Sequence, residues 1–156
     1  MELFRLSKEE HSTSLSGIGS AMYPGRWNTK GVEIIYTSTS RALAMAEVLA
    51  NLYAKTIPEN YLMMTIYVPD YTSISVIQQS SLPKGWDANV PNMSSKLIGN
   101  KFISDNNYCL LKIPSAAVSG DFNILINPNH NEFANIKIID KTPFVFDERL
   151  LKIILK

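Results

Sequence analysis

The sequence predicts a single α+β domain, with a mixed β core that carries a few helices. Its length of 156 residues is typical of one domain, and a hydrophobic content of 46% is enough to form a buried core. Strand-like runs dominate the second half, where prolines separate them. These runs do not alternate regularly with helical segments, so a doubly wound parallel sheet is disfavoured.

The first half of the chain predicts two short strands, a polar loop and one amphipathic helix. The expected segments are strands over Leu3–Leu6 and Glu33–Thr37, a loop over residues 7–31, and a helix from Arg41 to Lys55. The loop is rich in glycine and serine, and loops of this length in small domains often carry function. Apolar residues recur at helical spacing after Ser38-Thr39-Ser40, and any of these three can cap the helix. Pro58 is expected to end it.

The second half predicts six strands and one short helix. The strands are expected over residues 61–68, 73–77, 108–113, 122–126, 136–139 and 144–146, and the helix over residues 94–104. Pro114, Pro128 and Pro143 are interpreted as breakers between strands. Near the C-terminus, Asp147 and Arg149 are expected to pair or to cap a helix.

Composition excludes several classes of protein. Fifteen basic and fourteen acidic residues leave a net charge of +1, which gives no field strong enough to attract nucleic acid. Cys109 is the only cysteine, so no internal disulfide forms, and no zinc-binding spacing surrounds it. With two histidines, metal catalysis is disfavoured, and we expect no metal and no cofactor. No signal peptide or membrane-spanning segment is evident, so a cytoplasmic protein is expected.

Common catalytic signatures are absent. Gly17-Ile18-Gly19 lacks the third glycine of a dinucleotide-binding turn, and no phosphate-binding P-loop, G-x-S-x-G or H-E-x-x-H motif occurs. The remaining candidates are polar residues in unusual surroundings. Arg26 lies in the glycine-rich loop, where its guanidinium can bind phosphate and the neighbouring Trp27 offers a stacking face. An exposed loop arginine with one turn contact is an equal alternative.

Glu47 is the only charged residue in the apolar helix segment from Ala42 to Ala50. Such a carboxylate either faces a cleft, as catalytic carboxylates do, or lies on a stripe that faces water. Tyr36 at a strand end, Ser115 after another strand and His130 in an asparagine-rich turn are further candidates. Each of these three is more often structural.

These residues, in this order, resemble the RES domain family, named for Arg, Glu and Ser. The resemblance rests on five pieces, which are G-R-W-N-x-x-G at residues 25–31, Y-T-S at 36–38, A-M-A-E-V-L at 44–49, P-S at 114–115 and N-I-L-I-N-P-N-H at 123–130. The ending F-D-E-R-L at residues 146–150 is also similar. The resemblance covers nearly the whole chain, 1–156, although segment 78–107 carries none of these motifs.

The resemblance implies an ADP-ribosyltransferase-like fold and a toxin of a type II toxin–antitoxin pair. Its substrate would be NAD+, cleaved at the nicotinamide–ribose bond by hydrolysis or phosphorolysis, and its partner an Xre-family antitoxin. The implied catalytic residues are Arg26, Tyr36, Glu47 and Ser115, and the implied substrate-binding residues are Arg5, Trp27, Asn127 and His130. A homodimer is also an expectation from the family.

Two main alternatives remain open at this point, and a nucleic-acid toxin is a third, which the net charge of +1 and the lack of a basic stripe disfavour. One is a mono-ADP-ribosyltransferase that modifies a protein target, because the same arginine, tyrosine and glutamate would serve either reaction. The other is a non-catalytic interaction module, in which the polar residues belong to loops and caps. Loss of NAD+ with the purified chain distinguishes the first hypothesis from both.

Overall fold

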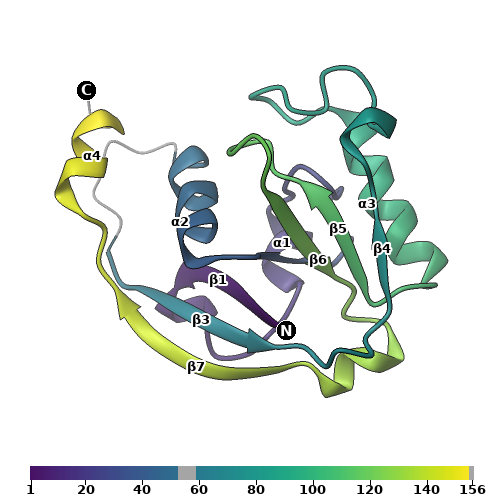
Figure 1. The fold of residues 1–156 in the computed structure, drawn as a ribbon, viewed down its shortest axis with the longest axis horizontal. Coiled ribbons are helices and arrows are strands. Elements are labelled where there is room, and N and C mark those ends of the chain that lie inside the picture. The colour runs from purple at the N-terminus through teal and green to yellow at the C-terminus, as the bar shows by residue number, and fades with distance from the viewer. Residues whose placement is uncertain (53–58, 155–156) are drawn as a thin grey trace.

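A computed structural model of the chain describes residues 1–52 and 59–154 (Figure 1). Seven strands form one sheet in the order β4-β5-β6-β2-β1-β3-β7. The strands are β1 Glu2–Lys8, β2 Ile35–Ser38, β3 Tyr61–Tyr67, β4 Ile74–Val76, β5 Leu110–Pro114, β6 Phe122–Ile126 and β7 Lys137–Phe144. Only β4 and β5 pair in parallel, and all other neighbours are antiparallel. The predicted α+β class with a mixed β core is confirmed.

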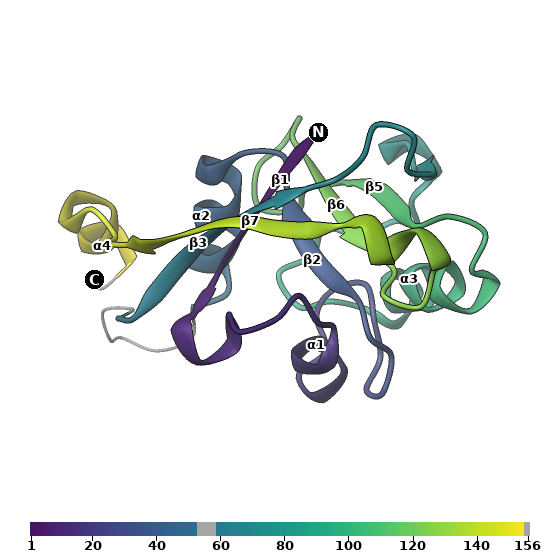
Figure 2. The same cartoon turned by 90° about the horizontal axis from the view of Figure 1, so that it is seen from below.

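Four α-helices accompany the sheet in the described residues. They are α1 Ile18–Met22, α2 Arg41–Ala50, α3 Met93–Asp105 and α4 Glu148–Ile154, and 3-10 turns cover Glu9–His11, Gln79–Ser81 and Asn131–Asn135. Figures 1 and 2 place α4 and α3 at opposite ends of the molecule, with β7 running along one edge between them. None of the helices in the described segments combines the length and apolar character needed to cross a bilayer.

The predicted loop over residues 7–31 is more ordered than its composition suggests. The first strand extends to Lys8, and α1 interrupts the loop. The Ser20 hydroxyl donates to the backbone oxygen of Ile34 over 2.7 Å and accepts from its N–H over 3.0 Å, which ties α1 to the start of β2. The helix signal was missed because this stabilisation is tertiary and α1 is only five residues long.

The helix predicted from Arg41 is confirmed as α2. Of the three candidate caps, Ser40 performs the role, since its hydroxyl accepts a 3.0 Å hydrogen bond from the N–H of Leu43. The described helix ends at Ala50, and the predicted end at Lys55 and the breaker Pro58 lie outside the described residues. The helix predicted over residues 94–104 is confirmed as α3, which Asn92 caps.

The last two predicted strands are wrong as separate elements. Residues 137–144 form one strand, β7, and Pro143 lies within it rather than breaking it. Strand β7 lies at an edge of the sheet and pairs only with β3. An edge strand tolerates proline, which has no N–H to donate to a neighbouring strand. The expected pairing of Asp147 with Arg149 is confirmed, at 2.8 Å, beside a helix α4 that was not predicted.

Alternation along the strands divides the core between the two faces of the sheet. One face carries a cluster that includes Leu3, Ile35 and Ile126. The opposite face carries two clusters. One packs against α3 and includes Trp27, Trp86 and Phe102. The other packs against α2 and includes Phe4, Leu6 and Ala44.

The two halves of the sheet meet at a single residue pair. Strands β1 and β2 share only the register pair Phe4–Ser38, whereas β1 and β3 share seven pairs from Glu2–Tyr67 to Lys8–Tyr61. The α2 cluster draws on β1 and β3, whereas the α3 cluster draws on β5 and β6, so the two clusters lie over different halves of the sheet.

Candidate functional site

Glu47 of α2 points to the sheet and is held there by two side chains. Its Oε1 accepts a 2.6 Å hydrogen bond from the Ser115 hydroxyl and a second one from the side-chain N–H of Asn123. These residues come from the end of β5 and the start of β6. Of the two interpretations of Glu47, the one in which it faces water alone is wrong. The structure brings the predicted Glu47 and Ser115 into direct contact.

The second oxygen of Glu47 differs from the first. Within residues 1–52 and 59–154, no donor is paired with Oε2. The carboxylate is therefore oriented through one oxygen, while the other remains able to accept a hydrogen bond from a bound hydroxyl. Such a group, fixed before a ligand arrives, stabilises positive charge better than a mobile one.

Asn123 is itself oriented by β2. The Ser38 hydroxyl donates to Oδ1 of Asn123 over 2.8 Å, so the amide N–H₂ must face Glu47. Ser38 and Asn123 are directly opposed in the β2–β6 ladder, which places both side chains on the α2 face of the sheet. The result is a hydrogen-bond relay from Ser38 through Asn123 to the carboxylate.

Ser115 is locked by the turn that follows β5. Its Oγ accepts from the N–H groups of Ala117 and Val118, at 3.1 and 3.0 Å. With both acceptor positions used, the hydroxyl proton is directed to Glu47. Ser115 is buried, and a serine turn at the end of a strand thus becomes part of the carboxylate's support.

Tyr36 links the same face of the sheet to the glycine-rich loop. Its hydroxyl donates to Oδ1 of Asn28 over 2.7 Å and accepts from the N–H of Trp27 over 3.0 Å. Burial raises the pKa of the Tyr36 phenol far above its ordinary value, and the smaller opposing effects of the Trp27 N–H and the Arg26 charge do not offset it. The phenol therefore stays neutral, and its ring lies against Gly25, where a Cβ atom would be only 2.8 Å from it.

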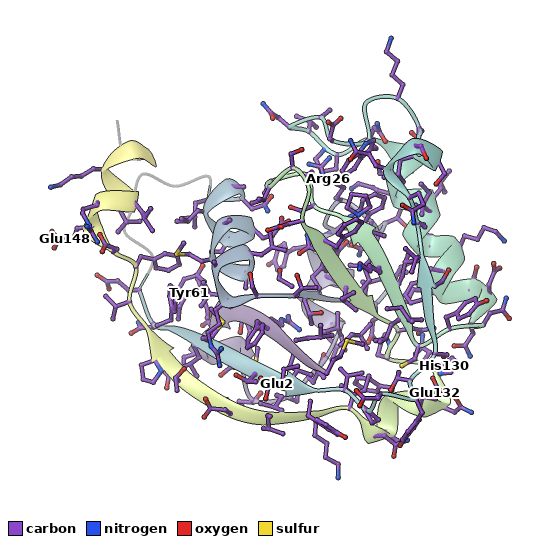
Figure 3. All side chains as sticks on the ribbon, viewed as in Figure 1. Glu2, Arg26, Tyr61, His130, Glu132 and Glu148 are labelled. Atoms are coloured by element: carbon purple, nitrogen blue, oxygen red, sulfur yellow. The ribbon has the colours of Figure 1, made fainter. Side chains whose placement is uncertain are left out.

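Arg26 is anchored by a segment that carried no motif. Its Nη1 donates to the backbone oxygens of Trp86 and Ala88, over 2.7 and 2.8 Å. Its other nitrogens have no partner in the described part of the chain, so part of the guanidinium fork remains able to bind an anion. Figure 3 shows Arg26 near the upper ends of β5 and β6, across from α2.

The prediction that Trp27 offers a stacking face is wrong. Its side chain is 3% exposed and packs on Trp86, with ring centroids 6.1 Å apart. The sequence placed it next to Arg26 in a polar loop, where an exposed ring was expected. The loop instead turns the indole into the apolar cluster beneath α3.

The structure also separates Arg5 from Glu47. Arg5 lies two residues after Leu3 on β1 and shares its face of the sheet, opposite to the face that carries Phe4 and α2. Its Nη1 donates to the backbone oxygen of Ser16 over 3.2 Å, and burial lowers the pKa of the guanidinium. Arg5 thus secures the segment before α1 and is not part of the Glu47 site.

Asn127 and His130 lie at the other end of β6. Asn127 follows Asn123 by four residues, which corresponds to about 13 Å of extended strand. It is fully buried, donates to Oδ1 of Asn106 and accepts from the N–H of Asn129. His130 caps the 3-10 turn Asn131–Asn135. Neither residue contacts Glu47, because the strand length separates them from it, and their predicted role in substrate binding stays a prediction.

Three supporting residues were not predicted: Asn28, Ser38 and Asn123. Each lies inside a motif that was recognised, yet none carries chemistry that spacing alone would reveal. Their roles depend on the pairing of β2 with β6 and on the path of the glycine-rich loop. The signal available in the sequence was only the presence of amide and hydroxyl side chains within those motifs.

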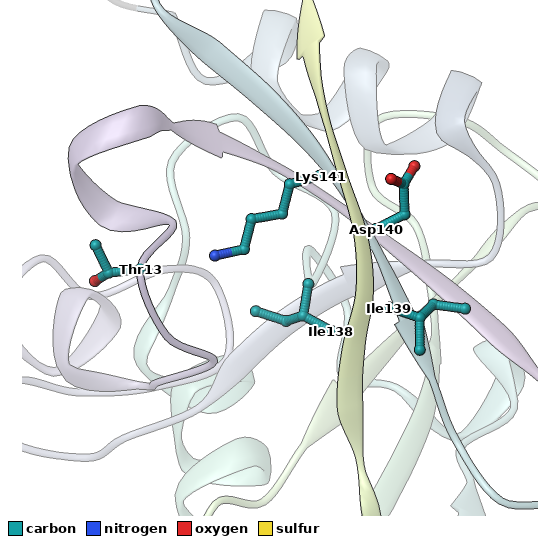
Figure 4. A pocket seen from close by; sticks show the side chains of 5 residues that line it. All are labelled: Thr13, Ile138, Ile139, Asp140 and Lys141. Atoms are coloured by element: carbon teal, nitrogen blue, oxygen red, sulfur yellow. The ribbon is translucent and has the colours of Figure 1, made fainter.

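Two surface hollows lie away from Glu47 and Arg26 in the described structure. An open hollow of about 430 Å³ beside β7 is lined by Thr13, Ile138, Ile139, Asp140 and Lys141 (Figure 4). A second, of about 250 Å³, lies between β4 and α3 and includes Ile77, Ile98 and Phe102. Neither includes Glu47 or Arg26, so the case for a site at Glu47 rests on its oriented polar groups.

Comparison with protein families gives one clear match. Residues 2–147 match the model of the RES domain. The relatives include the Prs ADP-ribosylating toxin of Sphingobium sp. strain YBL2, which is 36% identical over 140 residues, or 88% of this chain and 87% of the relative. They also include proteins named Toxin Res from Photorhabdus laumondii, at 30% identity over 97% of this chain and 98% of the relative, and from Pseudomonas putida, at 35% identity over 96% and 99%.

A solved structure shares the fold. The crystal structure of the M. tuberculosis MbcT–MbcA toxin–antitoxin complex contains a chain that matches with a TM-score of 0.75. The match covers 99% of this chain and 88% of the other, at 18% sequence identity. At that identity the comparison supports the fold alone, and it agrees with the seven-stranded sheet described above.

Proposed function

The chain belongs to the RES domain family, and on this premise we propose that it is a toxin that consumes NAD+ by cleaving the bond between nicotinamide and ribose. The observation that carries the proposal is the carboxylate of Glu47, oriented through Oε1 by Ser115 and Asn123. A lone carboxylate suits this reaction, since the leaving group needs no general acid. Relatives named as toxins, one of them ADP-ribosylating, support the choice of reaction class.

The proposed step balances as a substitution at the anomeric carbon. The bond from C1′ to the nicotinamide nitrogen breaks, its electron pair goes to nicotinamide, and nicotinamide leaves as a neutral molecule. Water or inorganic phosphate forms the new bond to C1′, and with water the products are ADP-ribose, nicotinamide and a proton. The transition state carries positive charge on the ribose, as in glycoside hydrolysis. Glu47 would stabilise this charge, and its Oε2 would accept a hydrogen bond from a ribose hydroxyl.

Arg26 and Tyr36 have supporting roles in this proposal. The guanidinium nitrogens of Arg26 that bind no backbone oxygen would contact the pyrophosphate. Tyr36, held neutral by burial, would present its ring to the nicotinamide or ribose and keep the glycine-rich loop in place through Asn28. Ser115 would act as a positioning residue for Glu47.

A second candidate is transfer of ADP-ribose to a protein side chain. One observation favours this transfer, which is the 36% identity to a relative named Prs ADP-ribosylating toxin. The same Glu47 would serve, with a nucleophilic side chain in place of water. The non-catalytic alternative gives no role to a carboxylate oriented by two side chains, Ser115 and Asn123, and we set it below both.

We also propose an antitoxin partner. The structural match is to a chain from a toxin–antitoxin complex, and the family resemblance implies an antitoxin of the Xre type in a bacterial cytoplasm. Co-expression with the neighbouring gene and co-purification would test it. Growth arrest on expression of the chain alone, relieved by that partner, is the expected result.

The deciding experiment is NAD+ consumption by the purified chain, with and without inorganic phosphate, with products identified by mass. Free ADP-ribose indicates a glycohydrolase, and ADP-ribose-1″-phosphate indicates a phosphorylase. Intact NAD+ in both conditions, together with label transferred to one protein in a lysate, would favour the transferase. Intact NAD+ with no transfer would refute the proposal.

Replacing Arg26 by alanine is expected to raise KM for NAD+ by about 10- to 100-fold, with a smaller fall in kcat. A lost charge-assisted hydrogen bond of about 1.5–3 kcal/mol accounts for this range. Initial rates over a range of NAD+ concentrations measure it. Arg149→Ala is the matched control, because Arg149 is an exposed arginine of α4 that pairs with Asp147, just before the helix. An unchanged KM in Arg26→Ala would remove Arg26 from the phosphate-binding role.

A further inference from the structure

Three potential metal ligands meet at the end of the sheet away from Glu47. One ligand atom from each of Cys109, His130 and Glu132 lies within 4.8 Å of the other two. Cys109 directly precedes β5, and the other two belong to the turn after β6. Figure 3 shows His130 and Glu132 side by side, at the opposite end of the strands from Arg26. The cluster was not visible in the sequence, because 20 residues separate the cysteine from the histidine.

The spacing of these atoms is close to that of a tetrahedral zinc site. Zinc bonds of about 2.0–2.3 Å to nitrogen, oxygen and sulfur place neighbouring ligand atoms about 3.3–3.8 Å apart. Nδ1 of His130 and Oε2 of Glu132 are 3.6 Å apart in the structure. Nδ1 accepts the N–H of Glu132 over 3.3 Å, so a metal bond at Nδ1 would replace this long hydrogen bond. The sulfur of Cys109 lies within 4.8 Å of a ligand atom of each of the other two residues, so only a small movement of the thiol would complete the tetrahedral geometry.

Neighbouring groups already orient the ligands. The N–H and hydroxyl of Ser73 donate to Oε2 of Glu132 over 2.8 and 2.5 Å, and the Ser73 hydroxyl accepts from the N–H of Cys109 over 3.0 Å. One serine therefore holds both the carboxylate and the backbone beside the thiol. Outer hydrogen bonds of this kind are a regular feature of metal sites.

A nucleophilic role for the same cluster is disfavoured by burial. Cys109 has no exposed surface, and burial raises the pKa of its thiol to about 12. Substrate cannot reach the sulfur, whereas a small ion can enter from the side of His130 and Glu132, whose side chains are 12% and 27% exposed. A bound cation changes the chemistry of the thiol, since a coordinating thiol loses its proton.

We propose that Cys109, His130 and Glu132 form a zinc site, with water in the fourth position. Binding forms one bond from Zn²⁺ to the sulfur, one to an imidazole nitrogen and one to a carboxylate oxygen, and it releases the thiol proton to solvent. The ion would join the segment before β5 to the turn after β6, and through Ser73 to the start of β4. It would stabilise this end of the sheet, and it is independent of the proposed reaction at Glu47.

Cobalt substitution provides a direct test, because Co²⁺ reports thiolate ligation by a charge-transfer band in the near ultraviolet. The full chain is stripped with a chelator under reducing conditions and titrated with Co²⁺. We expect a thiolate band that saturates at one equivalent and is displaced by Zn²⁺, with a rise in Tm on addition of Zn²⁺. A wild-type chain without this band would overturn the proposal, whatever its activity toward NAD+.

Variants assign the ligands. Cys109→Ser should abolish the band, and circular dichroism checks that this buried substitution folds. His130→Gln, at a side chain near the surface, should weaken Co²⁺ binding by more than about 10- to 100-fold, the usual cost of losing a mere outer-shell partner. His11→Gln is the matched control, because His11 is the other histidine and faces Glu10 at 3.4 Å on the exposed surface. Equal affinity of the His130→Gln and His11→Gln chains would refute the assignment.

Discussion

Replacing Glu47 by glutamine is expected to lower kcat/KM for NAD+ consumption by about 100- to 1000-fold, the usual effect of losing one oriented electrostatic group. Glutamine keeps an oxygen that can accept from Ser115 and Asn123, so the packing of α2 against the sheet should persist. Only the negative charge that the proposal places beside the ribose is lost. Single-turnover rates with a quenched assay measure the effect on the chemical step.

Two measurements separate a catalytic from a structural role of Glu47. Tm of Glu47→Gln should lie within a few degrees of the wild type, and NAD+ should still bind in a titration. Glu148→Gln, an exposed carboxylate in α4, serves as the matched control and should leave the rate unchanged. Full activity in Glu47→Gln would exclude Glu47 as the catalytic carboxylate, and a large fall in Tm would mean that the charge is structural.

Replacing Gly99 by alanine is expected to destabilise the protein by about 3 kcal/mol, although alanine favours helix by about 1 kcal/mol over glycine. Gly99 lies in α3, and a Cβ atom there would be 1.7 Å from the backbone oxygen of Trp27. That oxygen cannot rotate away as a side chain would. The helix must therefore move off the glycine-rich loop or the loop must shift.

This movement should also disturb the proposed site. Asn100, the next residue of α3, exchanges two hydrogen bonds with Thr29, at 3.0 and 2.8 Å, so α3 positions the loop that carries Arg26. Urea denaturation of Gly99→Ala gives the stability change, and the KM for NAD+ should rise with it. Gly19→Ala is the control, because a Cβ there meets no atom within 4 Å, and its stability should change by less than about 1 kcal/mol. Equal stability of the two variants would contradict the close packing of α3 on Trp27.

Local patterns in the sequence predicted most elements and pointed to Glu47 as a candidate site residue. The spacing of apolar residues after Ser40 predicted α2, and Glu47 was identified as the one charge within it. Both features depend on residues within a few positions of one another. The strand runs of the second half were found for the same reason, except where Pro143 lies on an edge strand that tolerates it.

Only the tertiary structure decided which candidate residues meet. Ser38 orients Asn123, which in turn contacts Glu47, because β2 pairs with β6, a contact across more than 80 residues. Arg5 lies away from Glu47 because side chains alternate between the two faces of a sheet. Asn127 lies away from Glu47 because four residues of extended strand separate it from Asn123. The sequence by itself determined the local elements and the residue types of the site. The register of the strands, and the face of the sheet on which each side chain lies, were decided by the pairing of strands far apart in the sequence. That pairing depends on the burial of both strands at once, so neither strand carries its signal alone.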